Sequence, residues 1–338
     1  MTHEFKAIIK AYIHAKENGF RSVLATVTAL DGSSYRKPGV RMLILEDHSM
    51  IGAVSGGCVE KDILVQSQYV FKTGRARMMT YDGRYRLGCE GILYILLEEF
   101  QPSALCIAAF NNCLKSRNTF KIHSYYKKKE CISEGLGSLI QFNKESFLLS
   151  EFSNLNIACL KFSEILPAPF KLMIFGAEHD AVQLCKLASF NGWEVSIIAG
   201  PLESKTIDNF PGATGFHAVS PDNLEINSID YNTAIVIMSH NYSVDLKYLL
   251  ELQHSKPAYI GLLGPSKRRE KLLSQFIEYC PEIDLSFIEQ IYGPAGLNIG
   301  AETPQEIAIS IISEILAVTR NKHPLSLKEK NSAIHSNN

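Results

Sequence analysis

The chain has 338 residues, of which 46% are hydrophobic and 20% are charged, a composition typical of a globular protein with room for two domain cores. A formal net charge of −1 excludes a general attraction to nucleic acid or to an anionic membrane surface. The eight cysteines form no C-x-x-C pair, which argues against a disulfide scaffold and against a zinc ribbon.

An amphipathic helix is predicted at the N-terminus. Apolar residues recur there at helical spacing, and Gly19 ends the pattern: Phe5, Ile8, Ile9, Tyr12 and Ile13. Because charged residues interrupt this stretch, we expect neither a signal peptide nor a membrane span, and hence a cytoplasmic protein.

A glycine turn opens a helix after three predicted strands, which are residues 21–29, 40–45 and 50–54. Gly56 and Gly57 allow a ligand to approach the backbone, and Cys58 stands at the helix start, where free N–H groups lower a thiol pKa. Cys58 is therefore a candidate thiolate ligand or nucleophile. A small buried hydrophobic side chain is an equally good interpretation of this cysteine.

A second glycine-flanked cysteine, Cys89, lies in residues 81–91, before a predicted strand at 92–97. The arginines and tyrosines of this segment suit an anionic, planar ligand, because arginine binds phosphate and aromatic rings stack. A plain hairpin would have the same composition. The two cysteines together favour the hypothesis of one shared ligand site.

Residues 101–170 indicate further β structure, and Pro167 and Pro169 mark a domain boundary. Residues 171–200 then predict one βαβ unit, with strands at 172–175 and 194–198. The turn at Gly176 departs from the dinucleotide fingerprint, since Glu178 replaces the second glycine and Ala199 replaces the ribose-binding acid. We therefore expect a structural turn that does not bind NAD(P).

Two polar loops follow the next predicted strands, 234–238 and 258–263, at the edge where such sheets bind ligands. The first loop holds Ser239, His240 and Asn241, and His240 alone is typical of a helix cap. In the second, residues 267–269 (Lys-Arg-Arg) oppose the helix dipole in a first turn, which a bound anion would relieve.

The last predicted helix begins with a capping box at Thr303, Pro304 and Glu306 and ends before Pro324. The fold class is α/β, with a C-terminal Rossmann-like, doubly wound parallel sheet and an N-terminal α+β domain. The expected boundaries are 1–166 for the N-terminal domain, 167–322 for the C-terminal domain and 323–338 for a disordered tail.

Several long motifs resemble, in order, those of the XdhC/CoxI family of xanthine dehydrogenase accessory proteins. The N-terminal half contributes GSSYRKPG, GGCVE and LGC. The C-terminal half contributes IFGAEHDAVQL, MSHNYSVDL, YIGLLGPSKRREKLL and GPAGLNIGAETPQEIAISIISEI. The resemblance covers most of residues 21–97 and 172–317, although Arg86 and Glu90 replace glycines around Cys89.

The resemblance implies a non-catalytic chaperone that binds the molybdenum cofactor and supports its sulfuration with a cysteine desulfurase. It would then insert the cofactor into a xanthine dehydrogenase-like molybdoenzyme, and a homodimer is left open. The cofactor carries a phosphate for helix starts, a planar pterin and a soft metal dithiolene. The motifs give these candidate cofactor-binding residues, with Cys58 and Cys89 as metal ligands: Gly56, Gly57, Cys58, Glu60, Cys89, Gly176, His179, Asp180, His240, Asn241, Ser266, Lys267, Arg268 and Arg269.

Two other classes of function compete with the chaperone. One is an NAD(P)-dependent oxidoreductase that uses the C-terminal Rossmann-like domain, and the other is a protein-binding scaffold. Dinucleotide binding would indicate the first, carriage of a pterin would indicate the chaperone, and the absence of both would indicate the scaffold.

Overall fold

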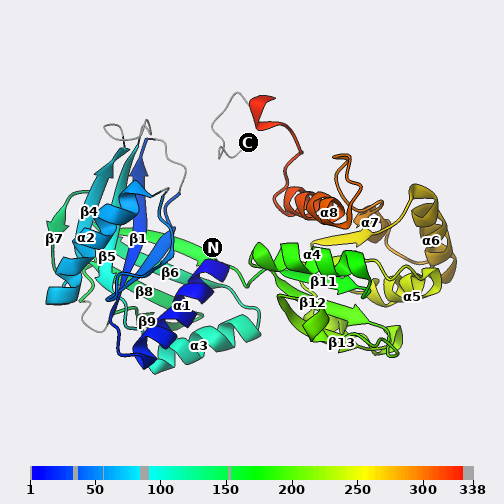
Figure 1. The fold of residues 1–338 in the computed structure, drawn as a ribbon, viewed down its shortest axis with the longest axis horizontal. Coiled ribbons are helices and arrows are strands. Elements are labelled where there is room, and N and C mark those ends of the chain that lie inside the picture. Colours follow the sequence, from blue (N-terminus) through cyan, green and yellow to red (C-terminus); the bar gives the residue numbers. More distant parts are fainter. Residues whose placement is uncertain (1, 33–36, 56, 84–90, 151–153, 330–338) are drawn as a thin grey trace. The chain divides into compact units, whose positions relative to one another are not determined.

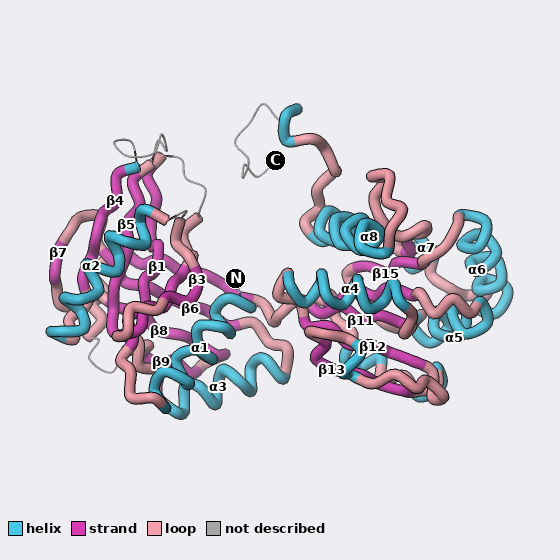
Figure 2. Tube along the Cα trace, viewed as in Figure 1, coloured by secondary structure: helices cyan, strands magenta, loops and turns pink. Residues whose placement is uncertain are grey.

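A computed structural model describes residues 2–32, 37–55, 57–83, 91–150 and 154–329. The chain divides into two units, residues 1–168 and residues 169–338. Figures 1 and 2 show the helices and strands of both units. No helix within these ranges has the length and apolar character needed to cross a membrane.

Unit 1 contains two antiparallel sheets, with the strand orders β3-β2-β1-β5-β4-β7 and β10-β6-β8-β9. Three helices accompany them: α1 (Thr2–Glu17), α2 (Cys58–Thr73) and α3 (Ala104–Lys115). The strands are β1 (Ser22–Asp31), β2 (Arg41–Leu45), β3 (Met50–Gly52), β4 (Arg77–Asp82), β5 (Ile92–Glu99), β6 (Phe120–Tyr126), β7 (Cys131–Ile132), β8 (Gly137–Phe142), β9 (Glu145–Leu148) and β10 (Leu160–Leu166).

The strands β1, β2 and β5 of the six-stranded sheet are buried on both faces. The α2 side chains Val59, Ile63 and Val70 pack with Val23 and Ile95 on one face. On the other face, α1, α3 and the four-stranded sheet enclose an aromatic cluster, in which the ring centroids of neighbouring phenylalanines lie 5.5–6.4 Å apart. Alternating strand residues thus enter two different cores, which explains the near-continuous apolar runs of the sequence.

The helix α3 corrects the expectation of β structure throughout residues 101–170. Ser103 caps it by accepting a hydrogen bond from the Cys106 backbone N–H at 3.2 Å, and Cys106, Phe110 and Cys113 are buried along one face. Serine at the N-cap was a usable signal in the sequence. The asparagines and cysteines of the helix, which have low helix propensity, obscured it.

Unit 2 is one parallel sheet with the order β13-β12-β11-β14-β15-β16, the strand order of a Rossmann fold. Its strands are β11 (Lys171–Phe175), β12 (Glu194–Ala199), β13 (Ala213–Ala218), β14 (Thr233–Ile237), β15 (Tyr259–Leu262) and β16 (Ile291–Tyr292). Its α-helices are α4 (His179–Phe190), α5 (Tyr242–Leu252), α6 (Ser266–Tyr279), α7 (Leu285–Glu289) and α8 (Pro304–Thr319). Short 3₁₀ turns occupy Ile207–Asn209, Pro221–Asn223 and Ile226–Ser228.

Helices cover both faces of this sheet, as the sequence predicted. The helices α4 and α8 lie side by side on one face, whereas α5, α6 and α7 pack on the other (Figure 1). The predicted capping box of α8 is confirmed, because Thr303 Oγ1 accepts from the Glu306 N–H and Glu306 Oε2 accepts from the Thr303 N–H. The predicted disordered tail lies partly outside the described residues, and Leu327–Glu329 form a 3₁₀ turn.

Buried charges lie between the two sheets of unit 1. Arg41 Nη1 and Glu164 Oε2 form an ion pair of 2.7 Å, with both side chains less than 10% exposed. Nearby on β5, Glu98 is 1% exposed, and its Oε2 accepts a hydrogen bond from the Ser138 backbone N–H at 2.8 Å. Burial raises the pKa of Glu98 to about 7, although Ser138 and the charge of Arg41 act in the opposite direction.

Glu98 should make the stability of the protein depend on pH. The unfolded chain releases this proton near pH 4.5, whereas the folded protein keeps it until about pH 7. The free energy of unfolding should therefore fall as the pH rises through this window, by up to about 3 kcal/mol. Glu98→Gln should remove this loss and be the more stable protein at pH 8.

Urea unfolding of both proteins between pH 4 and pH 8 measures this effect. The difference between the two free energies isolates Glu98 from the other titrating groups. A difference that stays constant over the whole range would show that folding does not raise the pKa of Glu98, and would contradict the prediction.

Candidate functional site

The glycine turn of unit 1 is held in place by Glu60. Glu60 Oε1 accepts from the backbone N–H groups of Val54 at 3.0 Å and Ser55 at 2.5 Å. Glu60 Oε2 accepts from the Gly57 N–H at 2.7 Å and from Ser55 Oγ at 3.0 Å. Burial alone would raise the pKa of Glu60, but these hydrogen bonds outweigh it and lower the pKa. The carboxylate is thus engaged in shaping the turn.

Gly57 is the N-cap of α2 and has a φ of 125°, a value that side-chain-bearing residues rarely adopt. A Cβ built at this position meets no atom of the described residues within 4 Å, so none of them fills the space beside the turn. Cys58 is the first residue of α2, as the sequence predicted. The Cys58 side chain, Gly56 and Cys89 lie outside the described part of the structure, so the hypothesis of a shared cysteine site remains a prediction.

The strand order of unit 2 reverses between β11 and β14, which is the ligand-binding switch point of this fold. Gly176 follows β11 with a φ of 134°, and a Cβ there would stand 2.5 Å from the Met238 carbonyl oxygen and 2.9 Å from the Ser239 nitrogen. The glycine is therefore required by the close passage of the loop after β14. This close contact explains why glycine is present even though the rest of the dinucleotide fingerprint is missing.

His240 and Asp180 meet across this switch point. His240 Nε2 lies 3.6 Å from Asp180 Oδ2, and His240 has a left-handed φ of 56°. The capping interpretation of His240 is wrong, because the N-cap of α5 is Asn241, whose Oδ1 accepts from the N–H groups of Ser243 and Val244. His179 is the exposed first residue of α4, beside this pair.

A buried aspartate that was not among the candidate residues connects the two polar loops. Asp245 is 2% exposed, and its Oδ1 accepts from the Ser239 hydroxyl at 2.5 Å. Its Oδ2 lies 2.5 Å from Arg268 Nη2. The carboxylate thus fixes the loop after β14 and the start of α6 to each other. An acid on the otherwise apolar side of α5 was the available signal.

The three basic residues of α6 have different surroundings. Arg268 pairs with Asp245 and lies over the Tyr242 ring, 5.7 Å from its centroid. Arg269 donates to the Ile291 carbonyl oxygen at 3.3 Å. Lys267 is exposed and forms no ion pair or hydrogen bond with the residues that the structure describes. Of the three, Lys267 is the side chain that is free to meet a ligand.

Two helices at this edge begin without a side-chain cap, and their charges are opposite. The N-cap of α4 is Glu178, which lies 3.7 Å from Lys205, and Asp180 stands in the first turn. The N-cap of α6 is Pro265, with Ser266 and Lys267 directly behind it. The first-turn N–H groups of both helices thus lack a side-chain cap, with acidic residues beside them at α4 and a basic residue beside them at α6.

Metal coordination by several protein side chains finds no support in the described ranges. They contain no group of three or more His, Cys, Asp and Glu residues that could hold a metal ion. A metal that arrives already chelated by its own ligand would need fewer protein donors, as the prediction for Cys58 and Cys89 supposes.

Two family models match the chain. The XdhC Rossmann domain matches residues 172–315, and the XdhC and CoxI family matches residues 15–82. The ranges fall in unit 2 and unit 1, respectively. They include the turn before α2 and the whole edge between α4 and α6.

Similar proteins span nearly the full chain. A probable xanthine dehydrogenase subunit of Bacillus subtilis is 28% identical over 92% of this chain and 96% of its own. The molybdenum cofactor insertion chaperone PaoD of Escherichia coli is 25% identical over 94% and 90%. The crystal structure of a xanthine dehydrogenase from Bacillus halodurans superposes with a TM-score of 0.74, at 26% identity, over 90% and 94% of the two chains. These matches, in agreement with the motifs, show that the chain belongs to the XdhC/CoxI family.

Proposed function

We propose that this protein is an accessory protein that binds the molybdenum cofactor and inserts it into a xanthine dehydrogenase-like molybdoenzyme. Support comes from two relatives of nearly equal length, one named a molybdenum cofactor insertion chaperone and the other a probable xanthine dehydrogenase subunit. The role is that of a carrier, and the cofactor is its cargo.

The observation that carries the proposal is the charge at the start of α6. An uncapped helix start on the ligand-binding edge of a Rossmann sheet suits a phosphate, and Lys267 adds a free positive charge there. The molybdenum cofactor ends in such a phosphate. Arg268 would support the site by its contact with Tyr242 and Asp245 and is the less available of the two cations.

The turn before α2 supplies the second part of the proposal. Cys58 occupies the first helical position, where the helix dipole favours a thiolate, and a thiolate is the donor that a soft metal prefers. The space beside Gly57, which no described residue fills, leaves room for a bulky group. Cys89 would be the second thiol in this proposal.

Further parts of the proposal concern partners and place. The family resemblance supports sulfuration of the bound cofactor by a cysteine desulfurase. Action in the cytoplasm is proposed from the N-terminal sequence, and a homodimer is left open.

The competing oxidoreductase requires NAD(P), and we expect NAD to bind weakly. Met238 and Ser239 occupy the space beside Gly176, Glu178 repels a pyrophosphate and Ala199 offers no acid to a ribose. Isothermal titration calorimetry of the full chain tests this, with Glu178→Gly as a variant that should bind NAD better. A dissociation constant in the low micromolar range or tighter for the unchanged protein would favour the oxidoreductase.

Lys267→Gln should reduce the amount of cofactor that the protein carries while leaving its thermal stability unchanged or slightly higher. The ammonium opposes the dipole of α6 by about 0.3–1 kcal/mol when no anion is bound. Carriage is measured as oxidised-pterin fluorescence after co-expression with cofactor synthesis. Lys247→Gln, an exposed lysine within α5, is the control. Equal pterin content in the unchanged protein, Lys267→Gln and Lys247→Gln would show that Lys267 does not contribute to cofactor binding.

Single-residue neutralisation is preferable to removing all three cations of α6. Arg268→Gln would leave the buried Asp245 carboxylate without its cation, and the loss of one partner of a buried pair costs about 3–5 kcal/mol. Loss of cofactor in that variant would therefore report misfolding as well as binding.

Cys58→Ser should lose more cofactor than Cys89→Ser, because Cys58 stands at a helix start, whereas Glu90 places a negative charge next to Cys89. Pterin content and the rate of thiol alkylation against pH are the two measurements. If Cys89→Ser lost more cofactor than Cys58→Ser, Cys89 would be the metal ligand. Full retention by both variants would restrict binding to the phosphate and pterin.

A further inference from the structure

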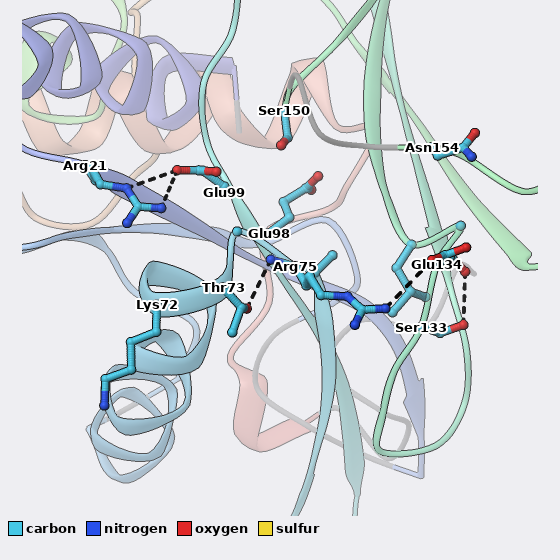
Figure 3. A pocket seen from close by; sticks show the side chains of 14 residues that line it. Arg21, Lys72, Thr73, Arg75, Glu98, Glu99, Ser133, Glu134, Ser150 and Asn154 are labelled. Carbon is cyan, nitrogen blue, oxygen red and sulfur yellow. Dashed lines mark hydrogen bonds and ion pairs between the residues drawn. The ribbon is translucent and has the colours of Figure 1, made fainter.

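A separate pocket of about 720 Å³ lies at the C-terminal end of α2 in unit 1 (Figure 3). Its volume is in the range of small-molecule sites. The pocket exists because β4 begins at Arg77, opposite Leu97, so Glu98 and Glu99 at the end of β5 have no neighbour on that side. Residues 72–76 and 133–136 supply the other walls.

Two carboxylate oxygens at this pocket lack hydrogen-bond donors among the residues that the structure describes. Glu98 uses Oε2 to accept from Ser138, and its Oε1 is buried without a partner. Glu99 uses Oε1 to accept from Arg21 Nε and Nη2 at 3.2 and 2.8 Å, and its Oε2 is likewise unpartnered. A buried acceptor without a donor costs about 1–3 kcal/mol, which a ligand that donates hydrogen bonds would recover.

The charges on the inner side of the pocket favour a cation. Above about pH 7, where Glu98 is ionised, the carboxylates of Glu98 and Glu99 both line this side. The Arg21 guanidinium that pairs with Glu99 also donates to the Phe71 carbonyl oxygen. The C-terminal end of α2 adds the negative end of a helix dipole, closed by Gly74 in the left-handed conformation. In Figure 3 the Glu98 carboxylate points away from β5 toward the side that carries Ser150.

The rim of the pocket has the opposite charge. Lys72 is exposed and forms no ion pair with another side chain in the described ranges, and Arg75 is 57% exposed, with Glu134 at 3.9 Å. An ion pair of that length at the surface contributes little, so Arg75 can exchange it for another anion. The pocket therefore has hydrogen-bond acceptors on its inner side and positively charged side chains at its rim.

We propose that this pocket binds a small zwitterion whose guanidinium or ammonium group meets Glu98 and Glu99, and whose carboxylate meets Lys72 and Arg75. A basic amino acid has this chemistry. The site is distinct from that of the cargo, because α2 has 16 residues and separates the pocket from Cys58 by about 24 Å.

Titration of the full-length protein at pH 8, where Glu98 is ionised, tests the proposal with L-arginine, L-lysine, agmatine and L-glutamate. Calorimetry or ligand-observed NMR is the readout. L-Arginine or L-lysine should bind saturably, and which one binds more tightly identifies the cationic group. Agmatine, which lacks the carboxylate, should bind more weakly than L-arginine, and L-glutamate should not bind.

Three variants separate the contributions of the two charged regions. Glu98→Gln should weaken all cationic probes about tenfold or more. The double variant Lys72→Gln/Arg75→Gln should weaken L-arginine but not agmatine, and it changes only exposed side chains, so its fold is not in question. Lys61→Gln, an exposed lysine near the other end of α2, should change nothing.

Two results would overturn the proposal. One is the absence of saturable binding by every cationic probe at ligand concentrations up to tens of millimolar. Even a weak specific ligand, with a dissociation constant of about 1–10 mM, would saturate the protein at such concentrations. The other is equal binding by Glu98→Gln and the unchanged protein. Neither result bears on pterin carriage, which is measured separately, so the failure of this proposal and that of the chaperone function can be distinguished.

Discussion

The ligand-binding edge of unit 2 depends on the buried Asp245 carboxylate. One of its oxygens accepts from the Ser239 hydroxyl and the other pairs with Arg268, so a single side chain fixes the loop after β14 relative to α6. Because both oxygens are used and the group is 2% exposed, the charge is compensated where it is buried. The pairing also engages Arg268, whose side chain is only 23% exposed, and leaves Lys267 as the more accessible cation of that helix start.

In unit 1, a carboxylate also accepts hydrogen bonds from the turn before a helix, in this case α2. Glu60, the third residue of the helix, folds back and collects three backbone N–H groups and one hydroxyl from residues 54–57. Asp245, the fourth residue of α5, likewise folds back onto Ser239. In both places a carboxylate near a helix start sets the conformation of the preceding loop. The carboxylate therefore positions the candidate residues of that loop and need not contact the ligand itself.

The sequence predicted those parts of the fold that local patterns determine. Apolar runs gave the strands of the parallel sheet, and the Thr303 capping box gave the start of α8. The cluster around Asp245 could not be predicted, because Asp245 and Arg268 are 23 residues apart and their contact depends on the spacing of β14 and β15. The pocket beside Glu98 has the same origin, since it results from the register at which β4 begins.

The opposite charges of the two uncapped helix starts suggest how a Rossmann sheet can lose one ligand and keep another. A dinucleotide requires close approach at the first turn, and here Glu178, Asp180 and the packing at Gly176 all oppose it. The start of α6, two strands further along the sheet, has no side-chain cap and carries basic residues instead. Because phosphates favour helix starts at strand ends, the anion that we propose for this edge is expected at α6, where it needs neither a pyrophosphate nor a ribose contact.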